Sequence, residues 1–298
     1  MPISKQRVSL LWFNVLSFNQ LFVYLMTRQQ LIQQILKKRS FLCVGLDSDV
    51  EKLPNRFSKD ASGVLAFNKA IIDATRSHCV AYKVNTAFYE SLGHRGWSVM
   101  EQTVDYVGQQ HFLIADAKRG DIGNTADQYA KAFFQTLSFD AITVAPYMGA
   151  DSVIPFLQHS GKWAIVLGLT SNAGAADFEL QPCGQQLLYE KVMQTAASWG
   201  TPDNLMFVVG ATQASVMGSI RKNYPDHFFL VPGVGAQGGS LEEVCRQALT
   251  PEAGLLINVS RAIIFASGQD DFAERAAAEA LQYQQQMAGL LNERMPGV

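Results

Sequence analysis

Eight short apolar runs, each followed by a helical stretch, constrain the fold of this chain more than any other feature. None of the runs alternates cleanly between apolar and polar residues, which is typical of strands buried on both faces of a parallel sheet. The runs lie at 41–46, 80–84, 111–115, 141–144, 163–167, 206–209, 228–231 and 255–258. Helical spacing follows them near 62–77, 96–108, 124–136, 151–158, 184–199, 213–222, 240–249 and 270–292.

Eight such units predict an α/β fold, a single-domain (β/α)8 TIM barrel over residues 26–298. A further helix, capped by Thr27, is expected before the first strand. A doubly wound sheet is the alternative, but it would require a glycine-rich dinucleotide motif after an early strand, and the sequence contains none. Segment 171–182 is the longest apparent loop, and its small residues suit a mobile lid.

Residues 1–25 do not fit this pattern. The apolar run 8–25 has the outline of a signal peptide or a short membrane anchor. However, Asn14, Asn19 and Gln20 interrupt it, and no small-residue cleavage site follows. We therefore expect residues 1–25 to be an N-terminal extension outside the fold, with a membrane anchor as the alternative.

Composition excludes several classes of function. The formal net charge is −2, so no basic surface argues for nucleic acid as a partner. The five histidines show no metal-ligand spacing, and we expect no metal site. The cysteines are far apart and form no CxxC pair, which indicates a reduced, cytoplasmic protein. They are Cys43, Cys79, Cys183 and Cys245.

The most informative segment is Asp116-Ala-Lys118-Arg-Gly-Asp121-Ile-Gly-Asn-Thr125, which directly follows the third apolar run. Side chains alternate along a strand, so Asp116 and Lys118 should point the same way, with Asp121 just beyond the strand end. Burying such charges is costly unless they pair. A structural ion pair is one interpretation of this segment, and a preorganised charged site is the other.

Other charged residues are predicted at the same end of the barrel, where the active sites of such folds lie. Asp47 ends the first strand and Lys83 lies in the second. Alternating lysine and aspartate charges would offset one another's desolvation. Together with the segment after the third strand, this cluster suits the generation of a carbanion beside a proton donor.

The last two strands lead into a predicted phosphate site. The glycine-rich turn 232–239 would let backbone N–H groups approach an anion, and a helix begins near Ser240. Arg261, after the eighth strand, can supply a bidentate charged contact. The sequence thus predicts a phosphorylated small molecule at one side of the barrel mouth, and a tight turn with a surface arginine is the alternative.

The charged segment of strand three, Lys83 in the preceding strand and the glycine-rich turn together resemble orotidine 5′-phosphate decarboxylases, most closely the longer bacterial type 2 enzymes. The resemblance extends from Met26 to the C-terminus. It implies conversion of orotidine 5′-phosphate to UMP and CO2, the last step of de novo UMP synthesis, without metal or organic cofactor.

The resemblance also implies catalytic roles. Lys118 would donate a proton to C6 of the pyrimidine, and Asp116 would lie against the departing carboxylate. Lys83 and Asp47 would hold the ribose hydroxyls and the charge network. Asp121 would act in the active site of a partner subunit, which implies a homodimer.

Further residues are implied to bind the substrate. They are Thr125, reaching across the dimer, Thr170 and Ser171 at the base, and Gln237, Gly238 and Arg261 at the phosphate.

Three other interpretations remain open at this point. A metal-dependent sugar-phosphate decarboxylase or aldolase of the same barrel superfamily is the nearest, although an acidic residue usually stands there in place of Lys83. A nucleotide-binding barrel without activity is the second. The third is an active enzyme tethered to a membrane by residues 8–25.

Overall fold

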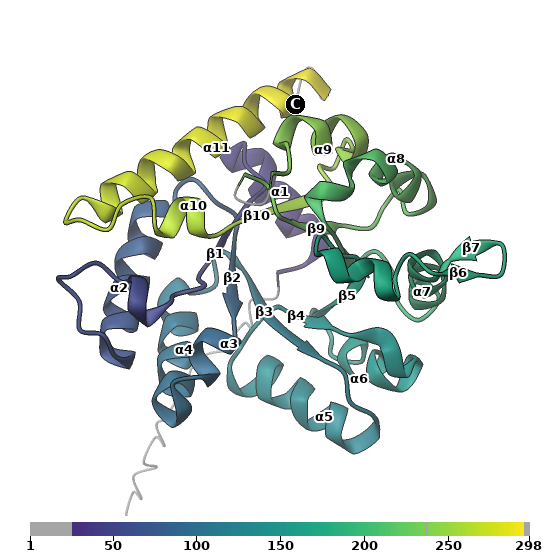
Figure 1. Cartoon of the computed structure of the whole chain (residues 1–298), viewed down its shortest axis with the longest axis horizontal. Coiled ribbons are helices and arrows are strands. Elements are labelled where there is room, and N and C mark those ends of the chain that lie inside the picture. Colours follow the sequence, from purple (N-terminus) through teal and green to yellow (C-terminus); the bar gives the residue numbers. More distant parts are fainter. Residues whose placement is uncertain (1–25, 236–237, 295–298) are drawn as a thin grey trace, which may run out of the picture.

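A computed structural model describes residues 26–235 and 238–294. Within them, eight parallel strands close into a barrel in the order β1-β10-β9-β8-β5-β4-β3-β2, with helices around the outside (Figure 1). The expected (β/α)8 fold is therefore confirmed. The barrel strands are β1 (Leu42–Gly45), β2 (Ala81–Asn85), β3 (Phe112–Arg119), β4 (Ala141–Val144), β5 (Trp163–Leu169), β8 (Leu205–Val209), β9 (Phe229–Pro232) and β10 (Leu255–Val259).

The helices mostly follow the strands as the sequence predicted. They are α1 (Arg28–Lys38), α2 (Ala61–Thr75), α3 (Ala87–Glu90), α4 (Gly93–Val107), α5 (Gly123–Lys131), α6 (Ile154–Leu157), α7 (Leu188–Ala197), α8 (Ala214–Asn223), α9 (Leu241–Ala248), α10 (Arg261–Ile264) and α11 (Phe272–Arg294). Thr27 caps α1 as expected: its hydroxyl accepts the Gln30 N–H, and the Gln30 side chain accepts the Thr27 N–H.

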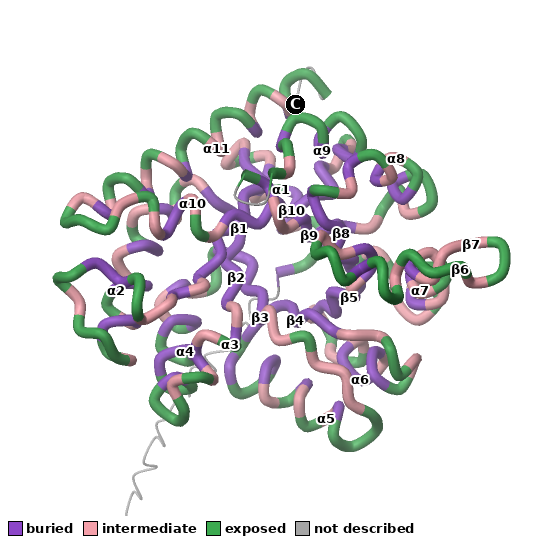
Figure 2. The backbone as a smooth tube through the Cα atoms, viewed as in Figure 1, coloured by how far each residue is buried: buried purple, intermediate pink, exposed green. Residues whose placement is uncertain are grey.

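The core lies between the barrel and its ring of helices. Figure 2 shows the strands buried at the centre and the exposed residues on the outer faces of the helices. Every residue of β1, β4, β8 and β10 is buried, because helices cover the outside of the barrel and side chains fill its inside. Trp163, at the start of β5, donates its indole N–H to the Met26 carbonyl. This contact ties the start of the described chain to the barrel.

Two helical expectations were partly wrong. The stretch 184–199 is helical only from Leu188, because a short hairpin of β6 (Pro182–Cys183) and β7 (Gln186–Leu187) precedes α7. Gly184 forms the hairpin turn at a φ of 67°, where glycine has no steric penalty. The stretch 151–158 begins as a separate 3₁₀ turn, and α6 starts only at Ile154 with Pro155 in its first turn.

The cysteines form no disulfide bond. All four are free, and Cys43, Cys79 and Cys245 are buried. Burial raises the thiol pKa of Cys79 to about 11.

Among the helices within the described ranges, none is long and apolar enough to cross a membrane. The expected N-terminal extension, residues 1–25, and the expected phosphate ligand Gln237 lie outside the described residues.

Candidate active site

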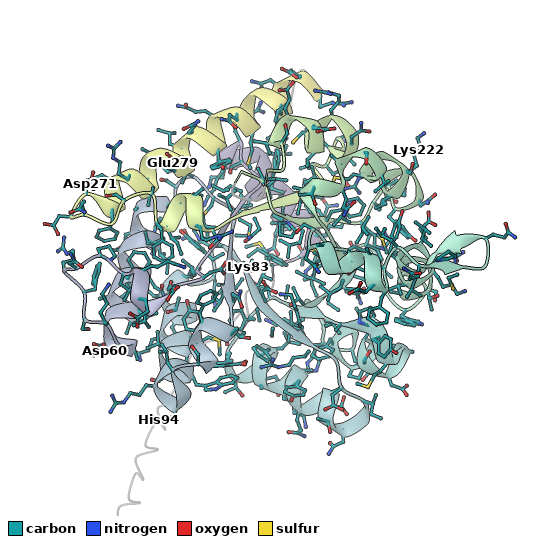
Figure 3. The ribbon with its side chains drawn as sticks, in the orientation of Figure 1. Asp60, Lys83, His94, Lys222, Asp271 and Glu279 are labelled. Carbon is teal, nitrogen blue, oxygen red and sulfur yellow. The ribbon has the colours of Figure 1, made fainter. Side chains whose placement is uncertain are left out.

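Lys83 lies at the centre of the barrel, whereas the other residues labelled in Figure 3 lie at its periphery. Its backbone is paired with Gly45 of β1, and its side chain is only 5% exposed. The Lys83 ammonium contacts Oδ2 of Asp116 at 2.8 Å and Oδ1 of Asp47 at 3.4 Å. Burial would lower the pKa of Lys83, but the two carboxylates outweigh it and raise this pKa. The lysine is thus a fixed cation between two anions.

Asp116 links Lys83 to a second lysine. Its Oδ1 lies 2.5 Å from the ammonium of Lys118, opposite the contact that Oδ2 makes with Lys83. Burial would raise the pKa of Asp116, but the charges of Lys83 and Lys118 hold it well below its usual range. The four residues Asp47, Lys83, Asp116 and Lys118 therefore form a chain of alternating charge with no net charge.

Lys118 is the open end of this chain. Its side chain is 53% exposed, against 12% for Asp116. We expected Asp116 and Lys118 to point the same way through strand alternation; their charged groups are in contact, but β3 is not regular there. The pairing of β3 with β4 slips between Ala115 and Arg119, and Lys118 adopts a φ of 47°. This bulge brings the lysine back over Asp116.

The charged chain borders a cavity of about 320 Å³ at the C-terminal ends of the strands. This volume lies within the range that is usual for small-ligand sites. Apolar side chains form one part of the wall, namely Leu167, Val208, Leu230 and Val234. The polar wall comprises Asp47, Lys83, Asn85, Asp116, Lys118, Thr143, Thr170, Ser171, Asn172, Asn258, Ser260 and Arg261. A polar ligand with an apolar face would fit such a lining.

The glycine-rich turn borders the cavity through Gly233 and Val234. Unlike the sequence expectation, three of its N–H groups are used within the turn: Gly235 donates to Gly239, Gly238 to Gly235, and Gly239 to Gly233. Gly238 does not line the cavity. A side chain at Gly239 would collide with the Gly233 carbonyl, so the turn can close on itself only with glycine there.

Arg261 begins α10 at the cavity rim and is exposed. Its side chain forms no hydrogen bond or ion pair with any residue that the structure describes. With no partner among the described residues, this guanidinium at the rim is a candidate contact for an anionic ligand group.

The segment after β5 lines the cavity through Thr170, Ser171 and Asn172. Thr170 is anchored by Glu179, nine residues further on. The carboxylate of Glu179 accepts the Thr170 N–H at 2.7 Å and the Thr170 hydroxyl at 2.8 Å. The Thr170 hydroxyl also lies 2.6 Å from Oδ1 of Asn172. Thr170 therefore lines the cavity and is also fixed by hydrogen bonds within its own loop.

Asp121 and Thr125 do not line the cavity of this chain. Asp121 is half-buried and its carboxylate accepts the N–H of Ile122, while Thr125 is exposed. Ile122 is 50% exposed, and Tyr147 on the neighbouring β4–α6 connection is 89% exposed. Two large apolar side chains are thus exposed on the segments that follow β3 and β4.

Sequence reasoning missed several polar residues of the cavity wall. Thr143 lies in β4, Asn258 in β10 and Asn85 at the end of β2. The signal was present in the sequence, because Thr143 is the only polar residue of its apolar run and Asn258 ends another. A polar residue within an otherwise apolar barrel strand is therefore a candidate for the cavity wall.

In the part of the chain that the structure describes, no three His, Cys, Asp or Glu side chains gather in a way that could hold a metal ion. The two carboxylates that lie nearest to each other in the cavity, Asp47 and Asp116, have the Lys83 ammonium between them. These carboxylates thus already have a cation as their partner.

The chain is similar to known proteins over most of its length. A family model described as the orotidine 5′-phosphate decarboxylase / HUMPS family matches residues 40–276. The chain is 56% identical to orotidine 5′-phosphate decarboxylase of Christiangramia forsetii over 271 residues, which cover 90% of this chain and 100% of that protein. It is 53% identical to that of Phocaeicola vulgatus over 270 residues, 89% of this chain and 99% of the relative.

Solved structures are similar as well. The Leishmania donovani OMP decarboxylase is 35% identical with a TM-score of 0.78, over 89% of this chain and 99% of that one. The UMP synthase of the same organism is 38% identical with a TM-score of 0.76, over 86% of this chain and 56% of that one.

Proposed function

This chain belongs to the orotidine 5′-phosphate decarboxylase / HUMPS family and catalyses the decarboxylation of orotidine 5′-phosphate to UMP, and from that premise we propose how its side chains carry the reaction. This reaction is the last step of UMP biosynthesis. The observation that carries the proposal is the chain of ion pairs from Asp47 through Lys83 and Asp116 to Lys118, which ends in a half-exposed ammonium at the cavity.

Lys118 is the proposed proton donor. When the bond between C6 and the carboxylate breaks, CO2 leaves and the electron pair stays on C6. A nearby ammonium stabilises this developing charge and then transfers a proton to C6, which gives UMP. Lys83 is the only other lysine of the cavity wall in the described chain, and both of its carboxylate partners hold it in place. Lys118 has the exposure that a donor needs.

Asp116 is proposed to face the carboxylate that departs. Like-charge repulsion there would raise the energy of the bound substrate, because Asp116 stays ionised over the whole physiological range. We assign the larger share of the rate enhancement to Lys118, since a preorganised cation acts on the charge that develops in the transition state.

The remaining cavity residues are proposed to bind the substrate. Asp47 and Lys83 would hold the ribose hydroxyls, and Thr170 and Ser171 would contact the base. Arg261 would bind the phosphate together with Gln237. Gly238, whose N–H bonds to Gly235, would shape the turn that holds Gln237. Binding energy from this remote phosphate can be used to orient the reacting end of the substrate.

We further propose that the reaction uses no metal and no organic cofactor. The ammonium of Lys83 supplies the positive charge between Asp47 and Asp116 that a divalent metal would supply in a metal-dependent relative. The alternative, a metal-dependent sugar-phosphate decarboxylase or aldolase, would lose its activity to a chelator.

A homodimer is proposed as the working form. Asp121 and Thr125 lie beside the barrel mouth but outside the cavity of their own chain, next to exposed Ile122. A partner subunit that packs against this segment would bring its own Asp121 and Thr125 to this cavity.

We propose that the barrel, residues 26–298, carries the activity by itself in the cytoplasm, without nucleic-acid or membrane partners. The family model matches residues 40–276, which lie within this range. Cell fractionation and kinetics of the full chain against a chain that starts at Met26 test this proposal. Membrane association of the full chain alone would contradict it.

The decisive experiment is a spectrophotometric decarboxylation assay with orotidine 5′-phosphate in excess EDTA. We expect rapid turnover by the wild type and a loss of more than about 10³-fold in Lys118→Ala. Lys222→Ala is the control, because Lys222 is exposed at the periphery of the barrel (Figure 3). Near-normal turnover by a folded Lys118→Ala would refute the assignment of the proton donor, and inhibition by EDTA would refute the metal-free reaction.

A further inference from the structure

The end of β3 departs from regular pairing where the two central active-site residues lie. Ala115 pairs with Ile142 and Arg119 pairs with Val144, so β3 uses four residue steps where β4 uses two. The extra residues form a bulge that includes Asp116 and Lys118. Within it Lys118 has a φ of 47°, in the left-handed region that non-glycine residues seldom adopt. Such a backbone persists only when its surroundings hold it.

One side chain supplies hydrogen bonds to this bulge from the neighbouring strand. The backbone N–H of Lys118 donates to Oγ1 of Thr143 at 2.9 Å. The Thr143 hydroxyl then donates to Oδ1 of Asp116 at 3.1 Å. An ionised carboxylate can only accept, so the direction of this chain is fixed. Thr143 is 1% exposed, and it lies in β4 among apolar residues.

The Oδ1 atom of Asp116 completes a closed circuit. It accepts the hydroxyl of Thr143 and also lies 2.5 Å from the ammonium of Lys118. Lys118 thus contacts Thr143 through its backbone N–H and Asp116 through its side-chain ammonium. A valine of the same shape at position 143 would leave the Lys118 N–H without a partner and Asp116 with one donor fewer.

We propose that Thr143 is a positioning residue for decarboxylation: its hydroxyl fixes the bulged backbone of Lys118 and the rotation of the Asp116 carboxylate, so that the Lys118 ammonium is aimed at the reacting carbon. This inference rests on the roles proposed above for Lys118 and Asp116. Thr143 takes no proton and contacts no reacting atom. It acts through the two residues that do.

The test compares Thr143→Val, which removes the hydroxyl and keeps the shape, with Thr143→Ser, which keeps the hydroxyl. We expect kcat to fall about 10- to 100-fold in the valine variant, because misplacing a reacting group by about 1 Å costs up to about 10²-fold. The affinity for UMP should change less than threefold, and Thr143→Ser should retain kcat within about threefold of the wild type. Hydrogen exchange at the Lys118 amide should be faster in Thr143→Val only.

Thr75→Val is the matched control, because it removes another buried threonine hydroxyl. This hydroxyl bonds to the Ile71 carbonyl and Tyr82, and neither Thr75 nor Tyr82 lines the cavity. Thr75→Val should leave kcat unchanged. Thr143→Ala serves the same purpose as Thr143→Val if the valine variant does not fold.

A wild-type kcat in either hydroxyl-free variant would overturn the proposal. So would a parallel loss of kcat and UMP affinity that Thr143→Ser does not rescue, because that pattern indicates direct substrate contact or packing. If Lys118→Ala is itself active, the proposed function fails first. If Lys118→Ala is inactive and Thr143→Val is normal, only the present inference fails.

Discussion

Lys83 balances the buried charge at the barrel mouth, because its ammonium lies between the carboxylates of Asp47 and Asp116. Removing one partner of a buried ionic cluster leaves the others uncompensated, which is more costly than losing a surface pair. The same geometry that suits the site for catalysis therefore also makes it a point on which stability depends.

We expect Lys83→Met to lower the free energy of unfolding by about 3 kcal/mol. Lys52→Met is the control, since Lys52 pairs with Asp49 on the surface and is 59% exposed. That change should cost less than about 1 kcal/mol. Urea denaturation of both variants at neutral pH measures the difference. Equal effects would show that the charge chain adds nothing to stability.

Asp140 is a second buried carboxylate, at the N-terminal end of β4, away from the cavity. It accepts the Leu113 N–H at 2.9 Å and lies 3.8 Å from the Lys162 ammonium. Burial is the main effect and raises its pKa from 3.8 to about 6, although Lys162 opposes it. Between these values the folded protein holds a proton that the unfolded chain releases. The contribution of Asp140 to stability is thus full below pH 3.8 and is lost as the pH rises through about 6.

Asp140→Asn is neutral at every pH and should lack this dependence. We expect its stability relative to the wild type to improve by up to about 3 kcal/mol between pH 4 and pH 7. Urea denaturation at several pH values measures this trend, with exposed Asp203→Asn as the control. A constant difference across the range would mean that the carboxyl group is not protonated at pH 4 to 6.

At the scale of elements, the loop after β5 is held at its start by Glu179. The carboxylate accepts two hydrogen bonds from Thr170, and the Thr170 carbonyl accepts one from Gln213. The loop itself contains a 3₁₀ turn over Ala173–Asp177 and then the β6–β7 hairpin. Glu179 therefore fixes the residues of the loop that line the cavity.

Glu179→Gln keeps the size of the side chain but offers one acceptor oxygen in place of two. We expect kcat/KM to fall about 3- to 10-fold, mainly through KM, because one hydrogen bond worth about 1 kcal/mol is lost at the start of the loop. Steady-state kinetics measure the effect. Asp177→Asn is the control, since Asp177 is exposed in the same loop. Unchanged kinetics of Glu179→Gln would show that this anchor is not needed.

At the scale of the whole molecule, the proposed dimer has a consequence that a monomer cannot share. If Asp121 acts in the partner's cavity, Lys118→Ala on one chain and Asp121→Ala on the other fall in the same site of a mixed dimer. One of its two sites then receives both substitutions and the other receives none. Mixing the two inactive variants should restore about a quarter of the wild-type activity, since half of the dimers are mixed and each holds one intact site.

The matched control mixes Lys118→Ala with Asp116→Ala. These two residues contact each other at 2.5 Å within one chain, so no mixed dimer has an intact site. Activity assays after subunit exchange, together with the mass of the particles in solution, measure the outcome. No recovery in the first mixture, with mixed dimers present, would place Asp121 outside the partner's site.

The sequence determined the barrel and the identity of its charged residues. Eight apolar runs with helices between them can bury their strands only in a parallel sheet. This pattern lies in short stretches of sequence, so it can be recognised without the structure. The same holds for Asp47, Lys83, Asp116 and Lys118, because the carboxyl ends of parallel strands meet at one end of the barrel. The Thr27 cap was readable for the same local reason.

Only the tertiary structure decided how these residues meet. The register slip between β3 and β4, the left-handed backbone of Lys118 and the bridging hydroxyl of Thr143 depend on pairing between strands that the order of residues does not reveal. Contacts between residues apart in the sequence also set two other features. These are the hydrogen bonds within the glycine-rich turn and the hydrogen bonds from Thr170 to Glu179. Periodicity fixes which residues face inward, whereas hydrogen bonds between distant segments fix their final geometry.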